Sequence, residues 1–353
     1  GDLAFTTKGL TLTNAAISEA LGQALSGRAN IGYTTGQPVQ ISGLDLSGAD
    51  YGLSGDATIY GTAEKFLTQL KMRLEADDIT RFSALSGRDL GGAAHVDLTG
   101  QIKPLDGMFD ININGLTRDL KVGIAQADAV LAGDTTLSVA TLRDETGTFV
   151  RDLSLENAAV TATGGAELRS NNSQARFTAK LTDIALIAPQ YSGPVTLTAT
   201  ADQDTRGWTV DASADGPYNT VLTAKGLATG PNATLNFAAE VPEIKDFVLD
   251  APVAGRVALD GVLRQTPAGW QVDANAAAPQ DVSATVKGLL TPLDIDFEAN
   301  IPRVEAFAPQ VTGPLTATGN LKQSDDGFAI DAQASGPYAA QVAVQGALTP
   351  SID

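Results

Sequence analysis

The chain has 353 residues, no cysteine and a formal net charge of −18, with 41 acidic against 23 basic residues. Without cysteine it has no disulfide, no thiolate metal site and no cysteine nucleophile, and its acidic surface repels nucleic acid and anionic lipid head groups. Apolar residues make up 43% of the chain but aromatic residues only 5%, which favours a thin layer of small side chains over a thick aromatic core.

The first predicted element is a short helical link between Asn14 and Gly22. Asn14 is of a residue type that caps helix N-termini, and Ile17, Leu21 and Leu25 would lie on one face of the helix.

Similar short links recur along the chain. Each opens with two apolar residues three positions apart, which is typical of a single helical or 3₁₀ turn, and three of them then pass through Ala-Pro, which ends the turn. The apolar pairs are Ile79/Phe82, Ile184/Ile187, Ile244/Phe247 and Val304/Phe307.

Between the links, apolar and polar residues alternate. The stretch from Leu293 to Ile301, in which Asp294 and Asp296 separate apolar residues, is the clearest example. This period of two puts all apolar side chains on one face of a strand and is typical of an antiparallel sheet with one wet face.

Landmark glycines recur at fixed spacing in the second half of the chain. Gly193 and Gly207 are matched 62 residues later, at 255 and 269, and again 58 residues after that, at 313 and 327. Such a period indicates stacked supersecondary units. Three tight hairpins share the pattern Gln-x-x-x-Gly-aromatic, in which the glycine supplies a positive φ: Gln203–Trp208, Gln265–Trp270 and Gln323–Phe328.

We therefore predict an all-β fold, an elongated repetitive antiparallel sheet of about 20–24 strands with about 60 residues and about five strands per repeat. An odd strand number would require each link to cross back over the sheet. Because so large an apolar face does not stay exposed in water, the sheet is expected to curl into a filled tube or a groove. The predicted divisions are residues 1–91 with N-terminal repeats and a helical link, 92–192 as a longer unit, 193–254 and 255–312 as single repeats, and 313–353 as a partial repeat.

Candidate catalytic and metal sites are weak. His95 is the single histidine, and alternation points it to the polar face with Asp97. Asp294, Asp296 and Glu298 line one strand face. Such a row is compatible with calcium binding or acid–base chemistry, but alternating carboxylates are also typical of the solvent-exposed face of a strand. No phosphate-binding, nucleotide-binding or nucleophile motif occurs in a suitable context. We expect no enzyme activity, no metal and no cofactor.

The links and amphipathic strands resemble those of the TamB proteins, long envelope proteins of the AsmA-like group in Gram-negative bacteria. The segment from Ile301 to Pro314 carries the resemblance best. The resemblance implies a central periplasmic β-groove, or β-taco. It also implies an inner-membrane anchor on the N-terminal side and, through a C-terminal domain, a TamA-like outer-membrane barrel partner, neither of which this sequence contains. We expect the chain to be a segment of such a longer protein.

The function expected on this basis is non-enzymatic. The apolar groove would carry the acyl chains of phospholipid between the inner and outer membranes, in the periplasm, and support outer-membrane biogenesis. One alternative is a chaperone or scaffold that assembles outer-membrane β-barrel proteins or autotransporters by β-augmentation; another is a structural spacer without a ligand. Trp208, Trp270 and Phe328 would either plug the core of each repeat or contact lipid. The residues predicted to line the groove are Leu70, Met72, Leu74, Val195, Leu197, Trp208, Val210, Trp270, Val272, Leu293, Ile295, Phe297, Phe328 and Ile330.

Overall fold

The computed structural model describes residues 1–248, 251–324 and 327–348, so the last five residues of the predicted partial repeat 313–353 lie outside it. It is all-β, with 60% of the chain in strands and 11% in helices, and the described residues form 22 strands, within the predicted range. The chain divides into a first unit, Gly1–Pro194, and a second unit, Val195–Asp353. In each unit every strand pairs antiparallel with the strands next to it in sequence, and the sheet is not closed into a barrel.

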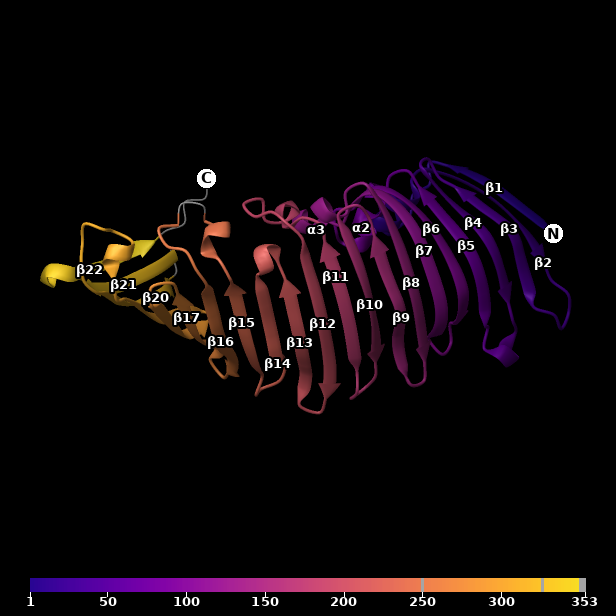
Figure 1. Ribbon diagram of the computed structural model, residues 1–353. Coiled ribbons are helices and arrows are strands. Elements are labelled where there is room, and N and C mark those ends of the chain that lie inside the picture. Colours follow the sequence, from indigo (N-terminus) through magenta and orange to yellow (C-terminus); the bar gives the residue numbers. More distant parts are fainter. Residues whose placement is uncertain (249–250, 325–326, 349–353) are drawn as a thin grey trace. The chain divides into compact units, whose positions relative to one another are not determined.

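The first unit contains β1 to β11 (Figure 1). Its elements are β1 (Asp2–Lys8), α1 (Ala15–Leu21), β2 (Ala24–Gly32), β3 (Val39–Ser47), β4 (Tyr51–Ile59), η1 (Thr62–Glu64), β5 (Thr68–Ala76), η2 (Thr80–Phe82), α2 (Ser83–Ser86), β6 (Gly91–Lys103), β7 (Met108–Lys121), α3 (Ala125–Val130), β8 (Asp134–Asp144), β9 (Gly147–Glu156), β10 (Val160–Leu168), β11 (Gln174–Leu181) and η3 (Ile184–Leu186).

The second unit contains β12 to β22. Its elements are β12 (Val195–Asp204), β13 (Gly207–Asp215), η4 (Pro217–Asn219), β14 (Val221–Leu227), β15 (Thr234–Val241), η5 (Ile244–Asp246), β16 (Val257–Thr266), β17 (Gly269–Ala278), β18 (Val282–Leu290), β19 (Leu293–Ile301), η6 (Val304–Ala306), β20 (Leu315–Ser324), β21 (Gly327–Ser335), η7 (Pro337–Ala339) and β22 (Gln341–Leu348).

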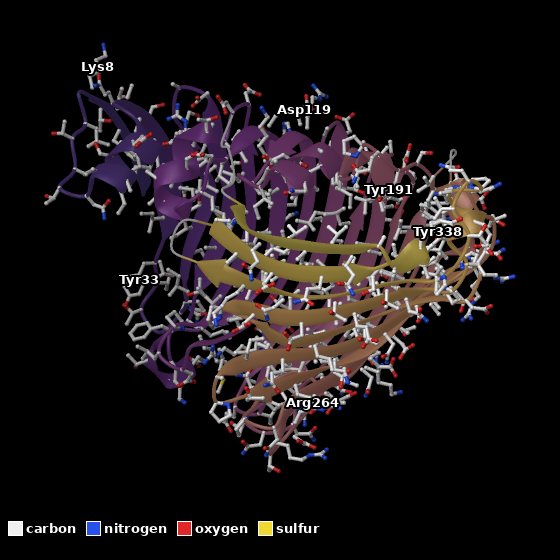
Figure 2. The ribbon with its side chains drawn as sticks, turned by 90° about the vertical axis from the view of Figure 1, so that its left-hand side faces the viewer. Lys8, Tyr33, Asp119, Tyr191, Arg264 and Tyr338 are labelled. Carbon is white, nitrogen blue, oxygen red and sulfur yellow. The ribbon has the colours of Figure 1, made fainter. Side chains whose placement is uncertain are left out.

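The two ends of the strands differ. Because successive strands run in opposite directions, the connections alternate between two rims of each unit. In the first unit, α1, α2, α3, η2 and η3 all lie at one rim, here called the helix rim, and the opposite ends form the hairpin rim. In the second unit η4 to η7 lie at the helix rim by the same alternation. Figure 2 shows Lys8, Asp119 and Tyr191 along the helix rim of the first unit and Tyr33 at its hairpin rim.

The predicted N-terminal link forms α1. The Asn14 side chain accepts a hydrogen bond from the Ile17 N–H at 3.1 Å, and Gly22, with φ 73°, ends the helix, so the predicted cap is confirmed. The prediction that Leu25 shares the helix face was wrong. Leu25 belongs to β2, because Gly22 terminates the helix three residues earlier.

The later links are also confirmed as short helical turns. Ile184, Ile244 and Val304 each begin a 3₁₀ turn, and Ile79 precedes η2. However, residues 193–254 and 255–312 hold four strands each, not five, and the links do not cross the sheet. The segments between β11 and β12, β15 and β16, and β19 and β20 take up the residues that a fifth strand would need. Since four is even, each link simply joins antiparallel neighbours, as β15–β16 and β19–β20 show.

The helix rim holds most of the fully buried side chains of the first unit. Ala76, Ala94, Thr117 and Thr135 are adjacent across β5 to β8 and at most 7% exposed. Here the Tyr51 hydroxyl donates to the Leu21 carbonyl of α1 at 3.1 Å. Small side chains on the sheet let the helices pack close to it at this rim.

Away from this rim, the described strands of each unit have no second layer packed on them. Each strand packs extensively only against its neighbours in the sheet. Most strand side chains on the apolar side are therefore half-exposed rather than buried.

Two glycines of the second unit lie very close to the backbone of the next strand. Gly226 in β14 and Gly288 in β18 have φ of 144° and 143°. A Cβ on Gly226 would lie 2.2 Å from the Thr234 carbonyl oxygen, and one on Gly288 would lie 2.1 Å from that of Asp294. Only glycine fits such a close backbone approach.

Gly288→Ala is expected to destabilise the protein by about 1–3 kcal/mol, because the new methyl group collides with the backbone of β19 and the φ is strained. Gly346 occupies the matching position in β22, where an added Cβ meets nothing within 4 Å. Gly346→Ala should therefore change stability by less than about 0.5 kcal/mol. Urea unfolding followed by circular dichroism measures both, and equal effects would contradict this account.

Acidic side chains hold the links closed. Asp183 accepts from the Ala185 and Gly193 N–H groups, both at 3.0 Å. Glu243 binds the equivalent Gly255 N–H at 2.9 Å. In the third link the corresponding residue is Arg303, and Glu305 binds the Gly313 N–H instead, at 3.2 Å. Hydrogen bonds from the Ala185 and Gly193 backbone lower the pKa of Asp183, and those from Gly255 and Lys245 lower the pKa of Glu243.

These links predict acid sensitivity. Because the pKa of Asp183 and Glu243 is lower in the folded state, their stabilising effect is complete above the unfolded pKa of about 4 and is lost as the pH falls through the folded pKa. Asp183→Ala combined with Glu243→Ala should lower the melting temperature at pH 7 and make it less dependent on pH below about 4. Asp260→Ala, at an exposed polar-face position of β16, is the control. A pH dependence unchanged from wild type would contradict the prediction.

Candidate functional site

The candidate site of the second unit is the apolar face of its sheet. Directly opposed residues of an antiparallel pair share a face, so the register can be followed from strand to strand. One such row crosses all eleven strands without a polar side chain: Ala201, Val210, Gly226, Leu235, Leu263, Val272, Gly288, Ile295, Leu321, Ile330 and Gly346.

The neighbouring rows have the same character. Two residues nearer the helix rim, the row is Ala199, Ala212, Ala224, Phe237, Gly261, Ala274, Val286, Phe297, Gly319, Ala332 and Val344. No Asp, Glu, Lys or Arg stands on this face at any paired position of the described strands.

The first unit carries an apolar face of its own. Its central row is Phe5, Gly27, Leu46, Leu53, Leu74, Val96, Gly115, Leu137, Leu155, Ala162 and Ala179. This sheet is less regular, because the register shifts at five of its strand pairs, whereas the second unit has no shift in any of the pairs described above.

The structure places every residue predicted to line a groove on the apolar face of its own unit. Leu70, Met72 and Leu74 lie on that of the first unit. All the others lie on that of the second unit: Val195, Leu197, Trp208, Val210, Trp270, Val272, Leu293, Ile295, Phe297, Phe328 and Ile330. They are half-exposed, with Phe328 the most exposed at 36%.

Large rings on these faces lie over glycines. Phe237 is opposite Gly261, and Phe297 is opposite Gly319. In both pairs a Cβ on the glycine would come within 2.6 Å of the ring Cζ. The ring thus fills the space that the missing side chain leaves, as in aromatic rescue of strand glycines. These two phenylalanine rings therefore cover the glycines opposite them.

The opposite face is polar and charge-paired. In β13–β14 Lys225 pairs with Asp211 at 2.5 Å, and in β17–β18 Lys287 pairs with Asp273 at 3.4 Å. In β21–β22 the equivalent pair is Gln345, donating to Asp331 at 2.8 Å. These side chains are exposed, so each pair contributes about 0–1 kcal/mol to the stability of the fold. Their main effect is to favour the observed strand register and to keep this face in contact with water.

The carboxylates considered as a metal or acid–base site also lie on this polar face. Asp294 binds Lys322 at 2.7 Å and Asn320 at 3.0 Å, and the Lys322 hydrogen bond, followed by that of Asn320, lowers its pKa. Asp296 binds the same Asn320 amide at 3.0 Å. In the described part of the chain no cluster of His, Asp and Glu could hold a metal ion. His95 lies on the polar face opposite Glu75 and Leu116.

One pocket of 340 Å³ lies over β9 to β11, where the register of β9 shifts at Arg151 against both β8 and β10. Its polar lining includes Arg151, Arg176 and Glu167. Arg151 is paired with Asp110. The lining residues do not bring a nucleophile and a base together, so they do not indicate a catalytic site.

No helix among the described residues is long and apolar enough to cross a membrane. No protein-family model, curated protein or solved structure matches the chain.

Proposed function

We propose that the chain is a non-enzymatic, lipid-carrying segment whose apolar faces form a groove, built from repeats of about 60 residues, for the acyl chains of phospholipid. The observation that carries the proposal is an apolar face that crosses eleven strands of the second unit without a charged residue and without a covering layer. Apolar area of this extent is uncommon on a monomer without a ligand.

The energetics favour long apolar chains as the ligand. Each CH₂ group removed from water contributes about 0.8 kcal/mol. A face of Ala, Val, Leu and Phe side chains offers few directional contacts, so it can hold an acyl chain without fixing it at one position. The resemblance to TamB proteins extends the proposal. In the cell envelope such a segment would sit in the periplasm between an inner-membrane anchor and a TamA-like barrel partner, and it would support outer-membrane biogenesis.

Organic extraction of the purified chain, analysed by mass spectrometry, should recover phospholipid. A photo-crosslinking residue at Val272 or Ile295 should capture it, whereas one at Asp273 or Asp294 should not, because the register turns those two positions to the polar face. Val272→Arg should reduce the recovered lipid, since an unpaired charge on an apolar surface is costly to desolvate. Equal labelling from both faces, or full lipid recovery in a folded Val272→Arg variant, would refute the proposal.

A further inference from the structure

The apolar face of the second unit is polar at one rim only. Its polar side chains are Gln203, Gln265 and Gln323, and each stands at the last paired position of this face before the hairpin rim. Each is directly opposite an aromatic residue, in the pairs Gln203–Trp208, Gln265–Trp270 and Gln323–Phe328. Amides and indole N–H groups suit the boundary between an apolar region and water.

The helix rim of the same face is apolar to its end. The outermost opposed pairs there are Val241–Val257, Ala278–Val282 and Ile301–Leu315. The next row inward includes Leu197, Leu222 and Leu259, of which Leu222 and Leu259 are 47% and 38% exposed. On this face, β12, β16 and β20 therefore each carry a hydrogen-bonding side chain at the hairpin end. None of the three carries one at the end near the helix rim.

The first unit carries its charged residue on the apolar face at the hairpin rim as well. Arg143, at the hairpin end of β8, lies between Phe109 and Thr148 and is the one charged residue at a paired position of the described apolar face. None of the ion pairs found among the described residues includes it. At the helix rim, by contrast, polar groups are satisfied internally, since the Asn157 amide donates to both Thr135 and the Val130 carbonyl at 2.9 Å.

Exposed apolar residues also occur at the helix rim of the first unit, beside charged ones such as Lys8 and Asp119. Ile17 of α1, Leu85 of α2 and Ile124 before α3 are 40%, 52% and 45% exposed. On the apolar face itself, a headgroup at the hairpin rim would meet Arg143 and Thr148 beside it.

From this we infer that each apolar face binds phospholipid in one orientation, with the headgroup at the hairpin rim and the acyl chains running along the strands toward the helix rim. The inference rests on the proposed function and adds to it the polarity of the bound lipid. Glutamine amides with aromatic partners, and Arg143 in the first unit, would contact the phosphate and glycerol region. The aliphatic rows near the helix rim would contact the chain ends.

The two tryptophans of the chain, Trp208 and Trp270, are both at the hairpin rim and serve as reporters. The purified chain would be loaded with phosphatidylcholine carrying a nitroxide either on the headgroup or at the end of an acyl chain, and quenching of tryptophan emission measured at matched lipid occupancy. The headgroup label should quench more strongly than the chain-end label.

A matched variant moves the reporter to the other rim. Trp208→Phe and Trp270→Phe remove the native indoles, and Leu259→Trp places one at an exposed helix-rim position of the same face. In this variant the order should reverse. Phe109→Trp in the same background reports the hairpin rim of the first unit beside Arg143 and should follow the wild-type order.

The outcomes separate the two proposals. If lipid is extracted and quenches, but both labels act equally or the chain-end label dominates at Trp208 and Trp270, the orientation is wrong while lipid binding stands. If neither label quenches in any variant and extraction recovers no phospholipid, both the orientation and the proposed function fail.

Discussion

The cross-strand register is the constraint on which everything else in this protein depends. Backbone hydrogen bonds fix which residues are opposed, and with a side-chain period of two a slip by one residue would exchange the two faces along a whole strand. In the second unit the pairing continues without a shift, so alternation in each strand becomes alternation of entire surfaces. Ladders such as Lys225–Asp211 and Lys287–Asp273 on one side, and Phe–Gly pairs on the other, disfavour any other alignment.

Local chemistry was sufficient to predict much of the fold. Period-two alternation identified the strands, Asn14 marked a helix start, and apolar pairs such as Ile244/Phe247 marked the 3₁₀ turns. The strand number per unit was wrong because it rested on an average spacing, and the links are longer than average connections. Leu25 was assigned to a helix because its spacing fitted, although Gly22 ends the helix before it.

The candidate site was predictable in part for the same reason. Whether a residue such as Val272 or Ile295 lies on the apolar face follows from its own strand, and the structure agrees. Which residues meet across strands does not. The position of Phe297 over Gly319 and that of Arg143 between Phe109 and Thr148 both require the register between strands, which alternation within one strand does not contain.

The four-strand content of residues 193–254 and 255–312 has a consequence for how such a protein can change in length. A block with an even number of strands starts and finishes at the same rim. Adding or deleting one by gene duplication or loss therefore leaves every later strand with its original direction, its original face outward and its glutamine at the same end. A block of three or five strands would invert the direction of everything after it. Even blocks let evolution adjust the span of the molecule in whole steps, without redesigning any interface beyond the junction.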